Sequence, residues 1–305
     1  MVNIRTISSG KKKYYYLEHT LRIGKGFKNK RIYLGSELPK NIGELKEKFL
    51  YNLFEEVYGK DLEAIKKSFS KEYGTYPESY KEKYLESFMI KFTYNTNKIE
   101  GGTLTLKETA DLLQENITPR NKPVRDVKEA EAHKKVFYEM LGHKKKLSLA
   151  TVLHWHQELL KETDPEIAGK VRKHTVAIAR SKTELPLPTE LDTMLYDFFK
   201  WYNHTYGKIS PVVLAALVHL RFVTIHPFSD GNGRISRLMM NHTLNSQGYP
   251  MLSIEYKNRN AYYTALERSQ TQRKEQTFMQ YLIKRYVKEY KEYVKAREKQ
   301  AKKLR

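Results

Sequence analysis

The sequence predicts a mainly α-helical protein, and three observations support this fold class. Apolar residues recur every three or four positions through most of the chain after residue 39, which is the spacing of one buried helix face. The segment 211–225 is apolar on nearly all sides, which is typical of a helix at the centre of a domain. The content of 40% hydrophobic and 30% charged residues suits a soluble helical protein. The 305 residues allow one large domain or two modest ones.

Residues 14–34 are the exception, because their side chains alternate between two faces in the manner of a strand. Gly24 and Gly26 mark a turn before a second short run, so a β-hairpin is expected in an appendage spanning residues 1–38. Its lysines and arginines lie among tyrosines, which fits contact with nucleic acid. A role in packing and solubility is the favoured alternative.

Residues 39–146 are expected to form an N-terminal helical region. Its helices are expected at about 45–57, 62–69, 80–101, 105–113 and 125–141. Gly59 is expected to end the first helix, and Gly101 to help stop the third. Thr105 and Glu108 form a capping box that opens the fourth.

Residues 147–270 are expected to form the core, and residues 271–305 a lysine-rich helix with a solvated end. The core helices are expected at about 147–160, 191–202, 211–225 and 235–247. Between 169 and 188 a short β-prone run and two prolines break the helical pattern. His154 and His156 lie two residues apart, so they do not share a helix face as a metal-binding pair would, and structural roles are expected for both.

The most informative stretch is residues 226–237, His-Pro-Phe-Ser-Asp-Gly-Asn-Gly-Arg-Ile-Ser-Arg. Its glycines let backbone N–H groups approach a phosphate, and the helix expected after them directs its N-terminus at the same place. Arg234 and Arg237 lie three residues apart and share a helix face, from which they can grip phosphate oxygens. The pattern therefore indicates a nucleotide polyphosphate site.

Two further side chains of this stretch supply chemistry for that ligand. Asp230 is a hard oxygen ligand suited to Mg²⁺, which binds through one carboxylate together with phosphates. His226 titrates near neutrality, so it is the candidate general base. A solvated turn would leave all of these groups together by chance and is the less favoured interpretation.

These residues resemble the signature of the Fic family, His-x-Phe-x-(Asp/Glu)-Gly-Asn-Gly-Arg-x-x-Arg, and every fixed position is matched. The resemblance covers roughly residues 84–266. It implies a Fic-fold helical bundle with a small β-hairpin flap at about 176–188, which holds a protein substrate by strand addition. An inert loop is the alternative for that segment. The resemblance further implies that ATP is bound by a set of loop and helix residues: Gly231, Asn232, Gly233, Arg234, Arg237, Asn260 and Tyr263.

A second motif lies N-terminal to the signature. Thr96-Asn97-Lys98-Ile99-Glu100-Gly101 resembles the inhibitory motif of the family, (Ser/Thr)-x-x-x-Glu-(Gly/Asn), at the end of the helix expected at 80–101. The resemblance implies that Glu100 pairs with Arg237 and thereby competes with a terminal phosphate for the same donors.

The function implied is protein adenylylation: transfer of AMP from ATP to a serine, threonine or tyrosine hydroxyl, with inhibition by Glu100. Removal of AMP from modified targets, self-modification, a homodimer and phosphocholine transfer stay open. In the related Doc toxins, which transfer phosphate, a lysine replaces the glycine matched by Gly233.

The rival hypothesis is a catalytically silent Fic-fold adaptor or nucleic-acid-binding protein that uses its basic surface. The net charge of +21 supports it, whereas the complete signature loop argues against it. A cytoplasmic protein without membrane association is expected, because the chain has no cysteine and no long apolar run.

Overall fold

The computed structural model describes residues 2–24, 26–178 and 181–303. Lys25 of the N-terminal turn, residues 179–180 of the expected flap and residues 304–305 of the expected last helix lie outside the described residues. The strands are β1 (Asn3–Ser9), β2 (Lys12–Ile23) and β3 (Gly26–Gly35). The α-helices are α1 (Ile42–Thr75), α2 (Glu78–Ile99), α3 (Leu106–Glu115), α4 (Val124–Gly142), α5 (Leu149–Leu160), α6 (Leu191–Thr205), α7 (Pro211–Ile225), α8 (Asn232–Asn245), α9 (Arg259–Thr271), α10 (Glu275–Glu289) and α11 (Lys291–Lys303). The mainly helical fold class is confirmed.

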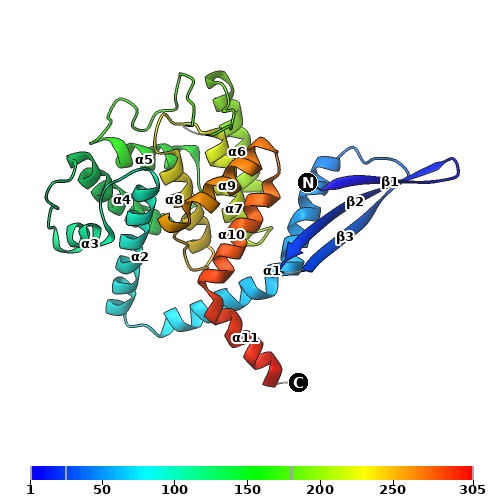
Figure 1. Cartoon of the computed structure of the whole chain (residues 1–305), viewed down its shortest axis with the longest axis horizontal. Coiled ribbons are helices and arrows are strands. Elements are labelled where there is room, and N and C mark those ends of the chain that lie inside the picture. The colour runs from blue at the N-terminus through cyan, green and yellow to red at the C-terminus, as the bar shows by residue number, and fades with distance from the viewer. Residues whose placement is uncertain (1, 25, 179–180, 304–305) are drawn as a thin grey trace. The chain divides into compact units, whose positions relative to one another are not determined.

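The centre of the bundle is the pair α7 and α8, joined by the loop of residues 226–231, the signature loop (Figure 1). Nearly every residue of both helices is buried, including the polar side chains of α8. Helices α2, α4 and α5 contact α8, while α6 and α10 contact α7. The loop between the central helices is therefore held on several sides, as a site built from fixed dipoles requires.

The N-terminal strands form an antiparallel sheet in the order β1-β2-β3. The expected hairpin is confirmed as β2 and β3, but the sequence analysis missed β1. The Asn3–Ser9 segment carries only Ile4 and Ile7 as large apolar residues, and these lie three apart, so the strand has no period-two signal. It forms because β2 offers it a free edge to pair with.

Two helix boundaries also differ from expectation. Helix α1 continues through Gly59 to Thr75, because a single glycine costs a helix only about 1 kcal/mol and the residues on both sides favour helix. The expected last helix is broken at Tyr290 between α10 and α11. The hydroxyl of Tyr290 donates a hydrogen bond to the carbonyl of Met251, a tertiary contact without a local sequence signal.

The expected β-hairpin flap is not formed as strands, since no strand is assigned to residues 171–178 or 181–187. The segment is held on α9 instead. Glu267 accepts a hydrogen bond from the backbone N–H of Lys182 at 2.8 Å, and Thr183 donates one to Gln270 at 3.1 Å. The backbone N–H of Lys182 thus bonds to a side chain, where a hairpin would have given it a carbonyl of a second strand.

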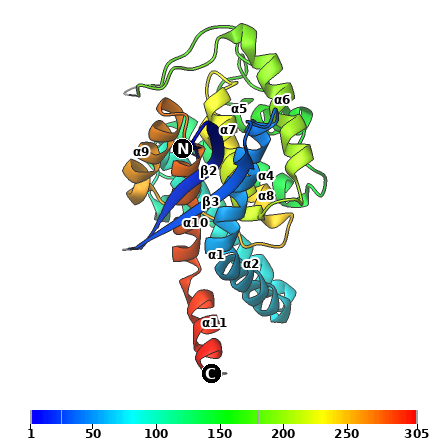
Figure 2. The same cartoon turned by 90° about the vertical axis from the view of Figure 1, so that its right-hand side faces the viewer.

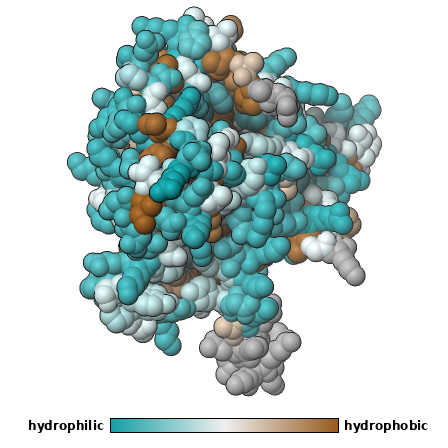
Figure 3. All heavy atoms as spheres, turned by 60° about the vertical axis from the view of Figure 1, so that its left-hand side comes forward, coloured by the Kyte–Doolittle hydropathy of each residue, from teal (hydrophilic) through white to brown (hydrophobic). Residues whose placement is uncertain are grey.

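Two compact units are distinguished, Met1–Glu63 and Ala64–Arg305, and their border lies within α1. The domain limits expected after residues 38, 146 and 270 stay predictions. No helix within the described ranges is both long and apolar enough to cross a membrane. The face seen in Figure 3 is largely hydrophilic, with apolar residues in small separate groups.

Candidate active site

His226 stands at the C-terminal end of α7 in the left-handed conformation, with φ 50° and ψ 57°. Its Nδ1–H donates a hydrogen bond to the carbonyl of Val223 at 3.2 Å. Because a carbonyl only accepts, this contact assigns the proton to Nδ1 and leaves Nε2 as a lone-pair acceptor. Burial lowers the pKa of His226, the Val223 carbonyl partly opposes this, and Arg172 lowers it further. The side chain is therefore a neutral base at pH 7.

Arg172 fixes the backbone on which His226 sits. Its side chain is buried and donates to the carbonyls of His226 at 2.8 Å, His174 at 2.9 Å and Pro186 at 2.7 Å. Its own N–H donates to the carbonyl of Pro227 at 2.9 Å. One guanidinium thus joins the histidine to both ends of the segment expected to be the flap, and sequence analysis did not identify it.

The loop after His226 is closed by Asn232. Its amide oxygen accepts from the N–H of Phe228 at 2.9 Å, and its amide nitrogen donates to the carbonyl of Phe228 at 2.7 Å. Both polar ends of Asn232 therefore brace the loop. Gly231 caps the N-terminus of α8 with φ 80°, a backbone position that favours glycine.

His156 supports the loop from α5. Its Nδ1 accepts from the N–H of Gly169 at 2.9 Å, and its Nε2–H donates to the carbonyl of Asp230 at 3.0 Å. The ring stacks on Phe228 with 3.7 Å between centroids. Burial is the main cause that lowers the pKa of His156 to about 4. This histidine is structural, as predicted, whereas His154 is exposed and lies 3.0 Å from Glu139.

Arg234 and Asp230 belong to a network of charged side chains. Arg234, with a side chain 1% exposed, lies 2.9 Å from Asp230 and 2.8 Å from Glu129 of α4. The contact to Glu129 is an ion pair, not an aligned hydrogen bond. Arg125 contacts Glu129 at 2.7 Å and Asp230 at 3.2 Å. Burial raises the pKa of Asp230, but Arg234, the Gly231 N–H and Arg125 outweigh it, so the pKa is lowered and Asp230 is ionised.

Arg237 meets the end of α2. Its guanidinium is 1% exposed, lies 2.5 Å from Glu100 Oε1 and donates to Tyr262 at 3.3 Å. Its Nε donates to the hydroxyl of Thr96. Burial lowers the pKa of Arg237, but Glu100 and Tyr262 raise it above its usual value. The expected pairing of Glu100 with Arg237 is therefore present in the structure, with Thr96 beside it.

The carboxylate of Glu100 lies directly over Gly233. A Cβ built on Gly233 would be 2.2 Å from Glu100 Oε1 and 3.1 Å from Arg237 Nη1. Since Gly233 is the second residue of α8, the carboxylate lies where a helix N-terminus attracts an anion. A side chain at position 233 would fill the space that this anion occupies.

The two residues expected at an adenine pocket lie on α9 with different surroundings. Tyr263 is half-buried and its hydroxyl donates to the carbonyl of Ile99 at 3.0 Å. Asn260 is exposed at the start of the helix, and only its carbonyl has a hydrogen bond within the described residues, from Thr264 at 2.8 Å. Tyr263 thus adjoins Glu100, while Asn260 faces solvent.

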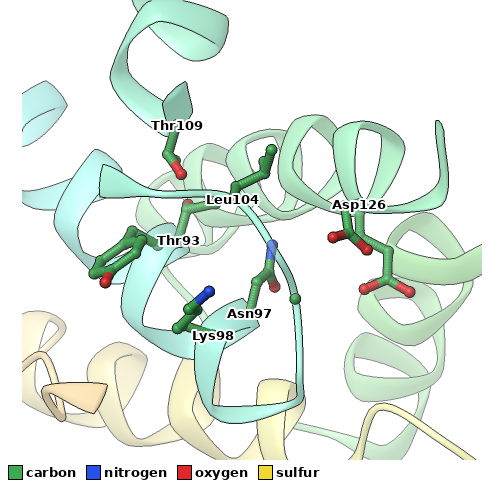
Figure 4. A pocket seen from close by; sticks show the side chains of 9 residues that line it. Thr93, Asn97, Lys98, Leu104, Thr109 and Asp126 are labelled. Atoms are coloured by element: carbon green, nitrogen blue, oxygen red, sulfur yellow. The ribbon is translucent and has the colours of Figure 1, made fainter. Parts of the chain in front are cut away.

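A small pocket lies beside the same end of α2 (Figure 4). The side chain of Asn97 points into it, and within the described residues neither of its amide atoms has a hydrogen-bond partner. Lys98, Asp126 and Glu129 line it further. Glu129 therefore borders this pocket and also contacts Arg234, so α4 links the pocket to the charged network around Arg234.

The chain is similar to known proteins in the region of this site. Residues 146–244 match the model of the Fic/DOC family. It is 33% identical over 178 residues to "Protein adenylyltransferase Fic" of Drosophila ananassae, a match that covers 57% of this chain and 35% of that protein. The protein of that name from Aedes aegypti is 32% identical over 183 residues, covering 58% and 36%. The chain thus spans about a third of the length of these curated relatives.

Solved structures support the fold. The crystal structure of a Fic domain containing signaling protein from Bacteroides thetaiotaomicron aligns with a TM-score of 0.68 and 27% identity, covering 76% of this chain and 96% of that one. Fic-1 of C. elegans aligns with a TM-score of 0.66 and 23% identity, covering 86% and 79%. The predicted Fic fold is therefore confirmed.

A cation at this site would depend on Asp230. No group of three or more histidine, aspartate and glutamate side chains suited to a metal occurs in the part of the chain that the structure describes. The side chain of Asp230 is ionised and 39% exposed. A single such carboxylate fits Mg²⁺, which prefers few protein ligands combined with phosphate oxygens.

Several residues of the site had no readable sequence signal. Glu129, Arg125 and Arg172 carry charge on segments where charged residues are common, and only tertiary contacts single them out. Tyr262 and Tyr263 are adjacent and project about 100° apart on α9, so the pair alone does not tell which tyrosine is buried. Tyr262 is the buried one, and its hydroxyl joins Arg237 to His219, 3.0 Å away.

Proposed function

We propose that this chain is a protein adenylyltransferase that transfers AMP from ATP to a hydroxyl group of a protein, and that Glu100 restrains it. The carboxylate of Glu100 over Gly233 supports this proposal most, because a negative group already occupies the N-terminus of α8 beside a buried guanidinium. A terminal phosphate carries the same charge and would use the same donors. The curated relatives named protein adenylyltransferase agree with it.

In the proposed reaction the hydroxyl oxygen of the target attacks the α-phosphorus of ATP. The bond between that phosphorus and the bridging oxygen to the β-phosphate breaks, and diphosphate leaves. His226 Nε2 accepts the hydroxyl proton, since Nδ1 is held by Val223. A positioned base of this kind contributes about 10²–10⁴-fold.

The phosphates would be bound by the loop and by α8. The backbone N–H groups at the start of α8 form the anion site, while Asn232 keeps the loop closed. Arg234 is turned by Asp230 and Glu129 toward the loop, and Arg237 would bind the outermost phosphate once Glu100 leaves. Asp230 would hold Mg²⁺, which neutralises charge on the phosphates when bound.

The target would lie along residues 176–188. Residues 176–178 and 181–187 of this segment carry no helix or strand, so a peptide could add to its backbone as a strand. Arg172 anchors both ends of the segment to His226, which would set the peptide beside the base. Removal of AMP from a modified target by the same site, self-modification, a homodimer and a cytoplasmic location remain part of this proposal.

Labelling with α-phosphate-labelled ATP and Mg²⁺ tests the proposal. The Glu100→Ala protein should label itself or a lysate protein more strongly than the wild type, because the α8 anion site is then free. Glu82→Ala is the matched control, since it removes an exposed glutamate from the same helix. Adding His226→Ala to Glu100→Ala should abolish the label.

Two results would count against the proposal. If Glu100→Ala and Glu82→Ala label equally, Glu100 does not restrain the site. If the label survives His226→Ala, the histidine is not the base and another group carries the reaction.

A further inference from the structure

The outer face of the N-terminal sheet lies outside the proposed active site and has a composition of its own. On the inner face, Lys28 and Lys30 contact Glu56 of α1 at 2.9 and 2.8 Å. These lysines pair with Leu21 and His19 of β2, so the alternate residues of each strand point the other way. Figure 2 shows strands β2 and β3 of this sheet. By the pairing of the strands, the outer face consists of Asn3, Arg5, Ile7, Ser9, Lys12, Tyr14, Tyr16, Glu18, Thr20, Arg22, Phe27, Asn29, Arg31 and Tyr33.

Positive and negative charges are strongly separated within the compact unit Met1–Glu63. Residues 1–38 hold nine lysines and arginines against two acidic residues, whereas residues 42–63 hold three against six. The cations of the outer face are Arg5, Lys12, Arg22 and Arg31, and its acidic residue is Glu18. The sheet is therefore basic in an otherwise acidic unit, and this separation favours a polyanion on the sheet side.

The aromatic side chains of this face are packed against one another. The ring of Tyr33 lies 6.3 Å from Tyr14 and 5.2 Å from Tyr16, and the guanidinium of Arg31 lies 5.8 Å over Tyr16. Their faces are thus partly occupied, which disfavours the open stacking platforms that single strands use. Phe27, 70% exposed, stands apart from this group.

The polar side chains of the outer face suit binding to a DNA duplex. Arginine and asparagine side chains form paired hydrogen bonds with guanine and adenine edges, and the face carries both types. Two neighbouring strands about 4.8 Å apart form a ribbon of the kind that the roughly 12 Å major groove of B-form DNA admits. The twelve residues of β2 extend for about 40 Å, a little more than one duplex turn. The major groove of double-stranded RNA is too narrow for such a ribbon.

We propose that the outer face of the β1-β2-β3 sheet binds double-stranded DNA in the major groove, through Arg5, Arg22, Arg31 and Lys12. Glu18 competes with the DNA, because it holds Arg5 at 3.4 Å and Arg31 at 2.7 Å in the free protein. This activity is independent of the proposed AMP transfer and gives a second function to the chain.

Fluorescence anisotropy of the full chain with a labelled 30-base-pair duplex of mixed sequence tests the proposal. Arg31→Ala should weaken binding about tenfold at 100 mM salt and make the salt slope shallower by about one. Lys28→Ala is the matched control on the same strand: it removes the same charge from the inner face and leaves Lys30 on Glu56. Its affinity should change less than twofold.

Glu18→Gln supplies a test in the opposite direction. It frees Arg5 and Arg31 without removing a cation and should tighten binding several-fold, an outcome that misfolding does not produce. Equal weakening by Arg31→Ala and Lys28→Ala, tighter binding to single-stranded DNA or to double-stranded RNA of the same length, or no binding to the duplex at 50 mM salt would each overturn the proposal.

Discussion

The contact between Glu100 and Gly233 predicts a strong energetic coupling that unfolding experiments can measure. Gly233→Ala adds a Cβ that would lie 2.2 Å from Glu100 Oε1, so the carboxylate has to leave. The backbone of α8 tolerates alanine there, because Gly233 is not among the residues with positive φ. The substitution is therefore harmful only while Glu100 is present.

The expected loss of unfolding free energy follows from the ion pair with Glu100 that Arg237 loses. Breaking a buried ion pair costs about 3–5 kcal/mol, but Glu100 is 30% exposed and Arg237 keeps Thr96 and Tyr262 as partners, so about 1–3 kcal/mol is expected. In a Glu100→Ala background the same change should stabilise the protein by about 0.5–1 kcal/mol, as alanine does in place of a helical glycine.

The assay is urea unfolding of the wild type, Gly233→Ala, Glu100→Ala and the double variant. The free energies of unfolding should be non-additive by about 1–3 kcal/mol, with Gly233→Ala changing sign between the two backgrounds. Additivity within about 0.5 kcal/mol would show that the carboxylate does not occupy the place over Gly233 in solution.

Three further predictions follow from the site. Because burial lowers the pKa of His226, the acidic limb of kcat/KM for AMP transfer should lie below pH 6.5; a limb above that value would contradict a neutral buried base. Arg172→Lys loses the fork that holds three carbonyls and should lower kcat about 10²-fold with little change in the KM for ATP, whereas a change in KM alone would refute its positioning role. His156 has a pKa of about 4 when folded against about 6.5 when unfolded. The stability that it contributes, about 3 kcal/mol, is therefore present above pH 6.5 and lost as the pH falls toward 4. The free energy of urea unfolding of His156→Gln should depend less on pH than that of the wild type, and identical pH profiles would reject this.

The parts of the fold that were predictable carry their information in neighbouring residues. The capping box of Thr105 and Glu108 forms as expected, with hydrogen bonds of 3.1 and 2.8 Å. The signals for the largely apolar α7 and for the glycine-flanked start of α8 are equally local. The contact of Glu100 with Arg237 spans 137 residues, and no local pattern predicts it. The resemblance to a family motif is what predicts this contact.

The parts that were missed depend on distant partners. Strand β1 exists because β2 has an edge to fill, and α1 passes Gly59 because the helix on both sides outweighs one glycine. Glu129 is one of many glutamates along the chain until the fold places it against Arg234. The described part of the expected flap has no strands, and Lys182 and Thr183 bond instead to Glu267 and Gln270, more than eighty residues away.

A buried guanidinium that needs an anion links these features and leads to a last prediction. In the proposed function Arg237 pairs either with Glu100 or with a phosphate, so the two exclude each other. The apparent dissociation constant of ATP is then the intrinsic one divided by the fraction of molecules in which Glu100 is released. A pair worth about 1–3 kcal/mol lowers that fraction about 5- to 150-fold. Calorimetric titration with a non-hydrolysable ATP analogue should therefore show Glu100→Ala binding about 5- to 150-fold more tightly than the wild type, with Glu82→Ala unchanged. Equal affinities of the wild type and Glu100→Ala would mean that the nucleotide does not use Arg237 at all.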